Sequence, residues 1–301
     1  MNFLCKLSKF RFIFFCAASF NIINFLNLSA QYKESGLACI QEIIPFSSPD
    51  ISQYNSIVQD SKGFFFIGGN NGLLAYDGNH WQQLNLNGPV SVCNGSEDKI
   101  IAYGKNYFGY VEYQPDGDIH FFSLYQSEND IQDTIGTILK IWSFHENLVL
   151  QTSSGVFTWN QDRLIKINLP GLPASVTCKG DSLLMHIPDK GLFIMYNNTV
   201  QPLNFGENPE EGHVVDIIDF NNQVLLYTEE KGFMIFRNGK IEIFNPEINK
   251  YLAENGYNDG ITDNKGNFIF STKKGSLILY NRMDGAINYY DTQNGLSLIH
   301  I

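Results

Sequence analysis

Residues 56–86 read SIVQDSKGFFFIGGNNGLLAYDGNHWQQLNL and show the clearest alternation of apolar runs and polar turns in the chain. Its first apolar run, at Ile57 and Val58, ends in a polar turn over residues 59–63. In that turn Asp60 can bond the backbone and Gly63 can adopt a positive φ. Apolar runs follow at 64–69 and 72–76, and a turn at 77–79 leads into a last run at 80–84. The pattern predicts four short antiparallel strands joined by tight turns.

The same unit recurs along the chain about every forty residues. Each copy has a glycine at which the third strand is expected to begin, and these are Gly72, Gly109, Gly155, Gly191, Gly232 and Gly275. This spacing accommodates four short strands and their hairpins, which is one propeller blade. We therefore predict an all-β fold, a β-propeller of four-stranded blades. Six blades are visible in the sequence, and we expect them to belong to an incomplete seven-bladed ring.

The repeats define the predicted domain order. A signal peptide at 1–30 and an extended lead-in at 31–50 precede a propeller at 51–296. The expected blades lie near residues 54–90, 91–125, 138–170, 175–206, 213–246 and 257–293. Unequal spacing places loop insertions near 124–137 and 246–255. Residues 297–301 do not resemble the start of another blade, and we interpret them as a truncated end and the chain as a fragment.

The first thirty residues have the pattern of an export signal. Lys6, Lys9 and Arg11 precede a largely apolar stretch, and Ser29-Ala30 offers a small-residue cleavage site. An uncleaved membrane anchor is the main alternative. A lipoprotein site at Cys16 is a weaker one, because the residues before it are not small.

Composition excludes some partners and some kinds of site. The 301 residues carry a formal net charge of -11, and an acidic surface repels a phosphate backbone, so no direct nucleic-acid binding is expected. After removal of the signal, Cys39, Cys93 and Cys178 remain, without metal-ligand spacing or an even count. We interpret them as small buried hydrophobic residues.

Residues 57–77 resemble the two-component-regulator propeller repeat, in which an Asp-x-x-Gly turn and an apolar strand precede a Gly-Leu-x-x-aromatic-Asp segment. Tyr76-Asp77-Gly78-Asn79-His80-Trp81 extends the resemblance, and residues 261–280 give a second, looser match. The middle copies lack the Asp-x-x-Gly turn, and only their spacing identifies them as members of the repeat. The residues expected to shape the repeat are Asp60, Gly63, Gly72, Tyr76, Asp77, Gly78, Trp81, Gly109, Gly155, Gly191, Gly232, Asp263, Gly266, Gly275 and Tyr280.

The resemblance implies a role in signalling. In that family the propeller is the sensory region of bacterial hybrid histidine kinases or of triple-tyrosine-domain regulators, and it lies on the periplasmic side of the inner membrane. The implied partners are the remainder of the receptor, namely a membrane helix and an output domain, and a second copy in a full-length homodimer. The implied ligand is a small molecule or glycan, with oligosaccharides and cell-wall fragments as the classes considered.

The sequence contains no recognisable catalytic motif, so we predict no enzyme activity for this segment, no cofactor and no metal. Trp142, Tyr107 and Tyr125 are weak candidates for ligand contacts, because aromatic faces can stack on sugar rings. Trp81 and Trp159 occupy regular repeat positions and are expected to pack between blades. Two alternatives to a sensor remain: a propeller-type polysaccharide lyase or glycoside hydrolase, and a non-catalytic protein-interaction scaffold.

Overall fold

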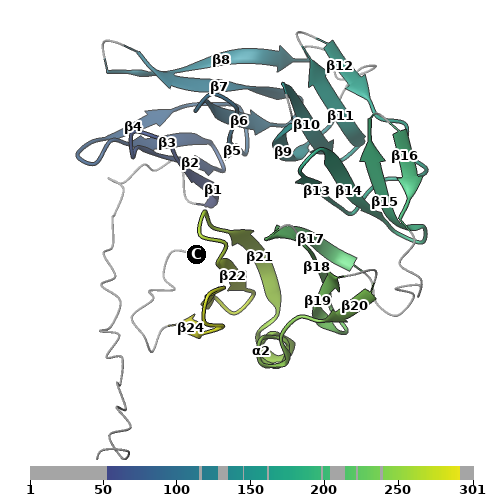
Figure 1. Cartoon of the computed structure of the whole chain (residues 1–301). Coiled ribbons are helices and arrows are strands. Elements are labelled where there is room, and N and C mark those ends of the chain that lie inside the picture. Colours follow the sequence, from purple (N-terminus) through teal and green to yellow (C-terminus); the bar gives the residue numbers. More distant parts are fainter. Residues whose placement is uncertain are drawn as a thin grey trace, which may run out of the picture. The chain divides into compact units, whose positions relative to one another are not determined.

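Six four-stranded antiparallel sheets make up the described part of the chain, arranged as the blades of a propeller (Figure 1). The computed structural model describes residues 53–114, 117–127, 135–144, 146–160, 163–197, 199–203, 214–221, 223–237 and 240–291. The predicted signal peptide at 1–30, the lead-in at 31–50, Cys39 and the predicted truncated end at 297–301 lie outside these residues. The prediction of an all-β propeller of four-stranded blades is confirmed, and a seventh blade stays a prediction.

Each blade is formed by four consecutive strands. Blade 1 contains β1 (Tyr54–Gln59), β2 (Phe65–Gly69), β3 (Gly72–Tyr76) and β4 (Trp81–Leu84). Blade 2 contains β5 (Ser91–Asn94), β6 (Ile100–Gly104), β7 (Tyr107–Tyr113) and β8 (Ile119–Gln126). Blade 3 contains β9 (Ile138–Phe144), β10 (Asn147–Thr152), β11 (Gly155–Asn160) and β12 (Arg163–Lys166).

The second half of the propeller repeats this order. Blade 4 contains β13 (Ser175–Lys179), β14 (Ser182–Ile187), β15 (Gly191–Tyr196) and β16 (Thr199–Pro202). Blade 5 contains β17 (Val214–Phe220), β18 (Gln223–Thr228), β19 (Gly232–Arg237) and β20 (Lys240–Ile243). Blade 6 contains β21 (Tyr257–Thr262), β22 (Phe268–Thr272), β23 (Leu277–Tyr280) and β24 (Ile287–Tyr290). The first strand of each blade is the innermost one in Figure 1.

Two turns confirm the prediction made from the Asp-x-x-Gly pattern. The Oδ1 atom of Asp60 accepts hydrogen bonds from the backbone N–H groups of Lys62 and Phe64, at 2.9 and 2.8 Å. Asp263 does the same for Lys265 and Asn267, at 2.8 Å each. Gly63 and Gly266 close these turns with φ of 89° and 78°. The repeated sequence therefore produces a repeated hairpin geometry, for a local reason.

The third strand begins at the expected glycine in blades 1, 3, 4 and 5. In blade 6, Gly275 lies in the turn, two residues before β23. In blade 2 the structure differs from the expected register. Here β7 already begins at Tyr107, and Asn106 adopts the positive φ of 61° in the turn. Gly109 lies inside β7 next to a β-bulge, where an added Cβ would come within 2.1 Å of the Phe122 carbonyl oxygen.

Five hydrophobic clusters join consecutive blades. The cluster between blades 1 and 2 includes Phe66 and Val92, and the cluster between blades 5 and 6 includes Phe233 and Phe268. The other three lie between blades 2 and 3, 3 and 4, and 4 and 5. The buried residues come chiefly from second and third strands, as the β-branched and aromatic character of those strands predicts. Packing between blades therefore supplies the core.

One element differs in type from the expectation. Residues 246–255, predicted as a loop insertion, form the helix α2 (Pro246–Asn255). Asn245 caps its N-terminus by accepting hydrogen bonds from the N–H groups of Glu247 and Ile248, at 2.9 and 3.1 Å. Ile248 and Leu252 are buried in the cluster between blades 5 and 6. A helix of 10 residues has fewer than three turns and cannot display a long apolar stripe, so its periodicity is too short to identify it from the sequence.

Candidate binding surface around the propeller axis

Six polar side chains occupy one equivalent position on the six innermost strands. Each pairs with the last residue but one of the second strand in its blade, next to the turn that leads to the third strand. These residues, called the polar ring below, are Ser56, Ser91, Lys140, Ser175, Asp216 and Asp259. Three hydroxyl groups, two carboxylates and one ammonium group thus lie around one end of the propeller axis.

Local backbone irregularities help to aim these side chains. The pairing register shifts beside Ser56, Lys140, Asp216 and Asp259, in β1, β9, β17 and β21. A β-bulge adds one residue to one strand and redirects the neighbouring side chains, and such irregularities are common near functional sites. Four of the six ring positions are therefore set by a feature that a regular strand would not provide.

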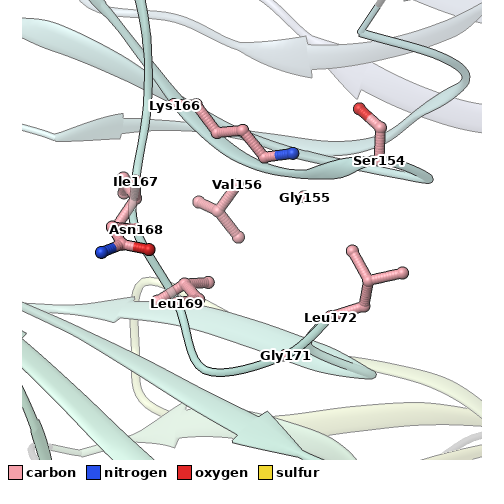
Figure 2. Close-up of a pocket in the computed structure, with 9 residues that line it drawn as sticks. All are labelled: Ser154, Gly155, Val156, Lys166, Ile167, Asn168, Leu169, Gly171 and Leu172. Atoms are coloured by element: carbon pink, nitrogen blue, oxygen red, sulfur yellow. The ribbon is translucent and has the colours of Figure 1, made fainter.

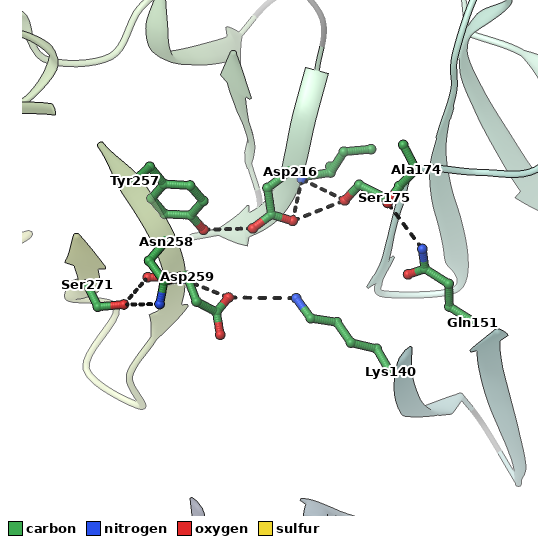
Figure 3. Close-up of polar contacts among 11 residues, drawn as sticks. Lys140, Gln151, Ala174, Ser175, Asp216, Tyr257, Asn258, Asp259 and Ser271 are labelled. Atoms are coloured by element: carbon green, nitrogen blue, oxygen red, sulfur yellow. Dashed lines mark hydrogen bonds and ion pairs between the residues drawn. The ribbon is translucent and has the colours of Figure 1, made fainter. Parts of the chain in front are cut away.

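The best-connected part of the polar ring joins blades 4, 5 and 6 (Figure 3). Asp216 accepts hydrogen bonds from the Ser175 hydroxyl at 3.0 Å, the Ile217 N–H at 2.9 Å and the Tyr257 hydroxyl at 2.7 Å. Burial raises the pKa of Tyr257, and the negative charge of Asp216 raises it further. The phenol therefore stays protonated and keeps donating to the carboxylate. These contacts hold Asp216 in one orientation.

Hydroxyl groups of the polar ring also connect neighbouring blades. Ser175 Oγ accepts a hydrogen bond from the Ile217 N–H of blade 5 at 3.0 Å. Ser56 Oγ accepts one from the Val92 N–H of blade 2 at 2.7 Å. Gln151, the partner of Lys140 in the sheet, donates to the carbonyl oxygen of Ala174 in blade 4 at 3.2 Å. Part of the ring therefore serves to fix the blades against one another.

Lys140 and Asp259 form the charged contact of the ring. Lys140 Nζ lies 3.8 Å from Asp259 Oδ1, although the two residues belong to blades 3 and 6, which are not consecutive (Figure 3). Their side chains are 48% and 60% exposed. An exposed pair of this kind contributes little to stability, typically about 0–1 kcal/mol. Its two charged groups remain accessible from solvent.

A hollow lies over blade 3, beside the connection to blade 4. It has a volume of about 430 Å³, and its lining is drawn in Figure 2. Its apolar lining includes Val156, Ile167, Leu169 and Leu172, and its polar lining consists of Ser154, Lys166 and Asn168. The Lys166 ammonium already lies 5.7 Å from the centroid of the Phe157 ring. This hollow offers an apolar surface but few directed polar groups, so the polar ring is the stronger candidate for specific binding.

The three aromatic residues predicted as ligand contacts lie elsewhere. Trp142 is partly buried against the cluster between blades 3 and 4. Tyr107 is only 8% exposed and makes an edge-on contact with Phe121. The ring of Tyr125 stacks on Phe108 at 5.7 Å in the cluster between blades 2 and 3. The structure does not bring these residues together, and their role in binding stays a prediction.

Two further tryptophans were expected between blades. Trp159 of blade 3 contacts Phe108 of blade 2 edge-on at 5.3 Å, as predicted. The ring of Trp81 stacks on that of Tyr76 in its own blade, with the ring centroids 4.6 Å apart. The Tyr76 hydroxyl in turn donates to the Gly78 carbonyl oxygen at 2.7 Å. The motif from Tyr76 to Trp81 thus stabilises a hairpin within blade 1.

The sequence reasoning did not identify the polar ring. In blades 1 and 6 the ring residue precedes the turn aspartate by four positions, as Ser56 precedes Asp60 and Asp259 precedes Asp263. An alignment of the repeats on that aspartate would have found these two. The middle blades lack the aspartate, so their ring residues are visible only in the strand register. Within the described ranges no group of three or more metal-ligating residues occurs, and no helix is long and apolar enough to span a membrane.

Comparison with known proteins identifies the fold. No protein-family model and no curated protein matches the chain. Among solved structures it is similar to the extracellular domain of a putative hybrid two-component system from B. thetaiotaomicron, with a TM-score of 0.60 and 19% identity over 84% of this chain. A second such domain from that organism gives a TM-score of 0.58 and 15% sequence identity over 82% of this chain. Virginiamycin B lyase from Staphylococcus aureus gives a TM-score of 0.58 and 13% sequence identity, and the match covers 79% of this chain and 84% of the lyase.

The chain spans about a third of the length of the two extracellular domains, 35% and 36% respectively. At these identities the likeness establishes the fold. It agrees with the resemblance to two-component-regulator propellers that the repeat motif indicates. The chain has the β-propeller fold found in the extracellular domains of hybrid two-component systems.

Proposed function

We propose that this chain is the exported, ligand-sensing propeller of a bacterial signal-transduction regulator, located on the periplasmic side of the inner membrane. The observation that carries the proposal is the polar ring, in which accessible charges from two non-consecutive blades meet at the axis of a fold shared with extracellular sensor domains. The predicted signal peptide and the repeat motif support the same assignment. The output domain and the membrane helix would belong to the rest of the receptor, which would act as a homodimer.

Sensing requires only that a ligand bind one conformation of the propeller better than another. The polar ring suits this role, because its members come from all six blades and connect several of them. A ligand held there would alter contacts between blades without any covalent step. Oligosaccharides and cell-wall fragments are the proposed ligand classes, since hydroxyl groups can donate to the carboxylates and accept from the serines and the lysine.

The direct test is a binding screen with the 301-residue chain. Thermal unfolding would be followed with a panel of oligosaccharides and peptidoglycan fragments, and positive results would be measured by calorimetry. A ligand present at a hundred times its dissociation constant stabilises the folded state by about 2.7 kcal/mol. The proposal predicts at least one such ligand, whose binding is weakened by Asp259→Asn. If no member of the panel binds, the proposed function is wrong.

The same screen separates the sensor from the enzyme alternative, which the likeness to a lyase makes worth testing. Each polysaccharide that binds would be incubated with the chain and assayed for unsaturated products and new reducing ends. A sensor binds without turnover. Turnover that is lost on substitution of a ring residue would instead assign the chain to a lyase or glycoside hydrolase.

A further inference from the structure

The charges of the polar ring are unequal, and their pairing is incomplete. Lys140 supplies one positive charge, while Asp216 and Asp259 supply two negative charges. Asp216 is satisfied by hydroxyl and N–H donors, and within the described part of the chain it has no ion-pair partner. Among the described residues, Lys140 is paired only with Asp259. The ring therefore keeps one uncompensated negative charge next to an exposed ion pair.

The Lys140–Asp259 pair leaves bonding capacity on both sides. The Lys140 ammonium group has three donors, and within the described ranges it makes one polar contact, of 3.8 Å. Asp259 uses Oδ1 for that contact and for the Gly260 N–H at 2.9 Å. Among the described residues, Asp259 Oδ2 has no partner. Both groups face solvent, so a ligand can reach them without prior opening of the fold.

A ligand that binds between Lys140 and Asp259 separates their charges, and this limits the charges that the ligand itself can carry. A neutral ligand inserted between Lys140 and Asp259 separates two opposite charges and replaces neither. A ligand with one charge pairs one of the residues and leaves the other alone. A ligand that carries both an ammonium and a carboxylate group pairs both, through charge-assisted hydrogen bonds. The additional negative charge of Asp216 strengthens the field at the ammonium end.

Because of this complementarity, we infer that the polar ring selects a saccharide carrying both an ammonium and a carboxylate group, with the carboxylate on Lys140 and the ammonium on Asp259. This inference rests on the proposed sensor function and specifies its ligand. Tyr257 and Ser175 hold Asp216 in place and act as positioning residues. Insertion of the ligand replaces the contact between blades 3 and 6, which links occupancy of the site to the arrangement of the blades.

Four monosaccharides on one scaffold test the charge requirement. Muramic acid carries both charges, N-acetylmuramic acid only the carboxylate, glucosamine only the ammonium, and N-acetylglucosamine neither. Saturation-transfer NMR and calorimetry with the 301-residue chain would rank them at neutral pH. Muramic acid is expected to bind about tenfold more tightly than either singly charged sugar, in line with one added charge-assisted contact. Equal binding of all four, or binding of none, overturns the inference.

Two substitutions assign each charge to its partner. Lys140→Gln should reduce the affinity for muramic acid to that for glucosamine, and Asp259→Asn should reduce it to that for N-acetylmuramic acid. Both residues are largely exposed, so the variants should fold, and thermal unfolding checks this. The matched control is Lys99→Gln, which removes an exposed ion pair with Glu97 of similar length, 4.0 Å, in the turn between β5 and β6, at the end of blade 2 opposite the ring residue Ser91. It should leave all affinities unchanged, and an equal loss in this variant contradicts the assignment.

Failure of the charge requirement and failure of the sensor function give different outcomes in these experiments. If a neutral oligosaccharide binds in the wider screen while the four probes show no preference, the sensor proposal stands and the charge requirement is wrong. If no compound binds in either experiment, both are wrong.

Discussion

Glycines and aspartates at the turns show how single residues fix the blade geometry. Asp263 accepts two backbone hydrogen bonds and also one from the Asn267 side chain at 2.9 Å. Gly266 closes the same turn, and its carbonyl oxygen accepts a hydrogen bond from Asn221 of blade 5 at 3.0 Å. This turn therefore serves its own hairpin and the contact with the neighbouring blade.

Replacement of Gly266 by alanine should destabilise the protein more than replacement of Gly191. Both residues have positive φ, 78° and 88°, so each change costs roughly 1–2 kcal/mol in backbone strain. At Gly266 the new Cβ would also approach Asn221 Oδ1 to 2.2 Å, whereas nothing lies within 4 Å at Gly191. The clash should add about 1–3 kcal/mol. Urea unfolding of the two variants measures the difference, and equal losses would contradict the packing described for Asn221.

At the scale of elements, α2 shows how a helix is stabilised in a β-propeller. Its N-terminus is capped by Asn245, and Pro246 stands at the first helical position, where no N–H donor is required. Asn249 holds it against β19, because its Oδ1 accepts the Phe233 N–H at 2.8 Å and its Nδ2 donates to the Lys231 carbonyl oxygen at 3.0 Å. The helix therefore belongs to the core between blades 5 and 6.

Two substitutions should separate capping from packing in α2. Asn245→Ala leaves the Glu247 and Ile248 N–H groups without their acceptor and should cost about 1 kcal/mol of unfolding free energy. Leu252→Ala creates a cavity at a fully buried position and should cost about 2–5 kcal/mol. Glu254→Ala, at an exposed position of the same helix, is the control and should stay within about 0.5 kcal/mol of the parent. A loss at Glu254 as large as that at Leu252 would show that α2 is not packed as described.

At the scale of the whole molecule, tyrosines buried in several blades couple stability to alkaline pH. Burial raises the pKa values of Tyr103, Tyr227 and Tyr257, and it raises the pKa of Tyr107 to about 12. Below the ordinary tyrosine pKa of 10.0, these phenols are neutral in the folded and the unfolded chain. Above it, the unfolded chain loses protons that the folded chain keeps. The free energy of unfolding must then fall as the pH rises.

Urea unfolding at pH 8, 9, 10 and 11 tests this coupling. Stability should begin to fall near pH 9, because burial also raises the pKa values of the Cys93 and Cys178 thiols from 9.0 to about 12. Above pH 10 each buried tyrosine should add up to about 1.4 kcal/mol per pH unit to this fall. Tyr257→Phe should reduce the slope between pH 10 and 11, although the change also removes the hydrogen bond to Asp216. Tyr196→Phe is the control, because Tyr196 is 49% exposed and should leave the slope unchanged. A stability that stays flat to pH 11 would contradict the burial of these phenols.

Features that depend on neighbouring residues can be predicted from the sequence. The Asp-x-x-Gly turns, the four-strand unit and its repetition follow from turn chemistry and strand propensity, which act over a few residues. Three other features depend on contacts between residues that are distant in the sequence. The prediction that the third strand of blade 2 begins at Gly109 is wrong, because Asn106 adopts the turn conformation that a glycine was expected to supply. Helix α2 needed the packing of Ile248 and Leu252 between two blades.

The polar ring depended on the tertiary structure most of all. Lys140 and Asp259 are far apart in the sequence, and nothing in their local surroundings marks them as partners. They meet because bulges shift the register of β9 and β21, and because the blades surround a common axis. The prediction of Trp142, Tyr107 and Tyr125 rests on their chemical type, whereas the ring residues are defined by strand register. Local chemistry thus determines the blade, and only the assembly of six blades determines which side chains face one another.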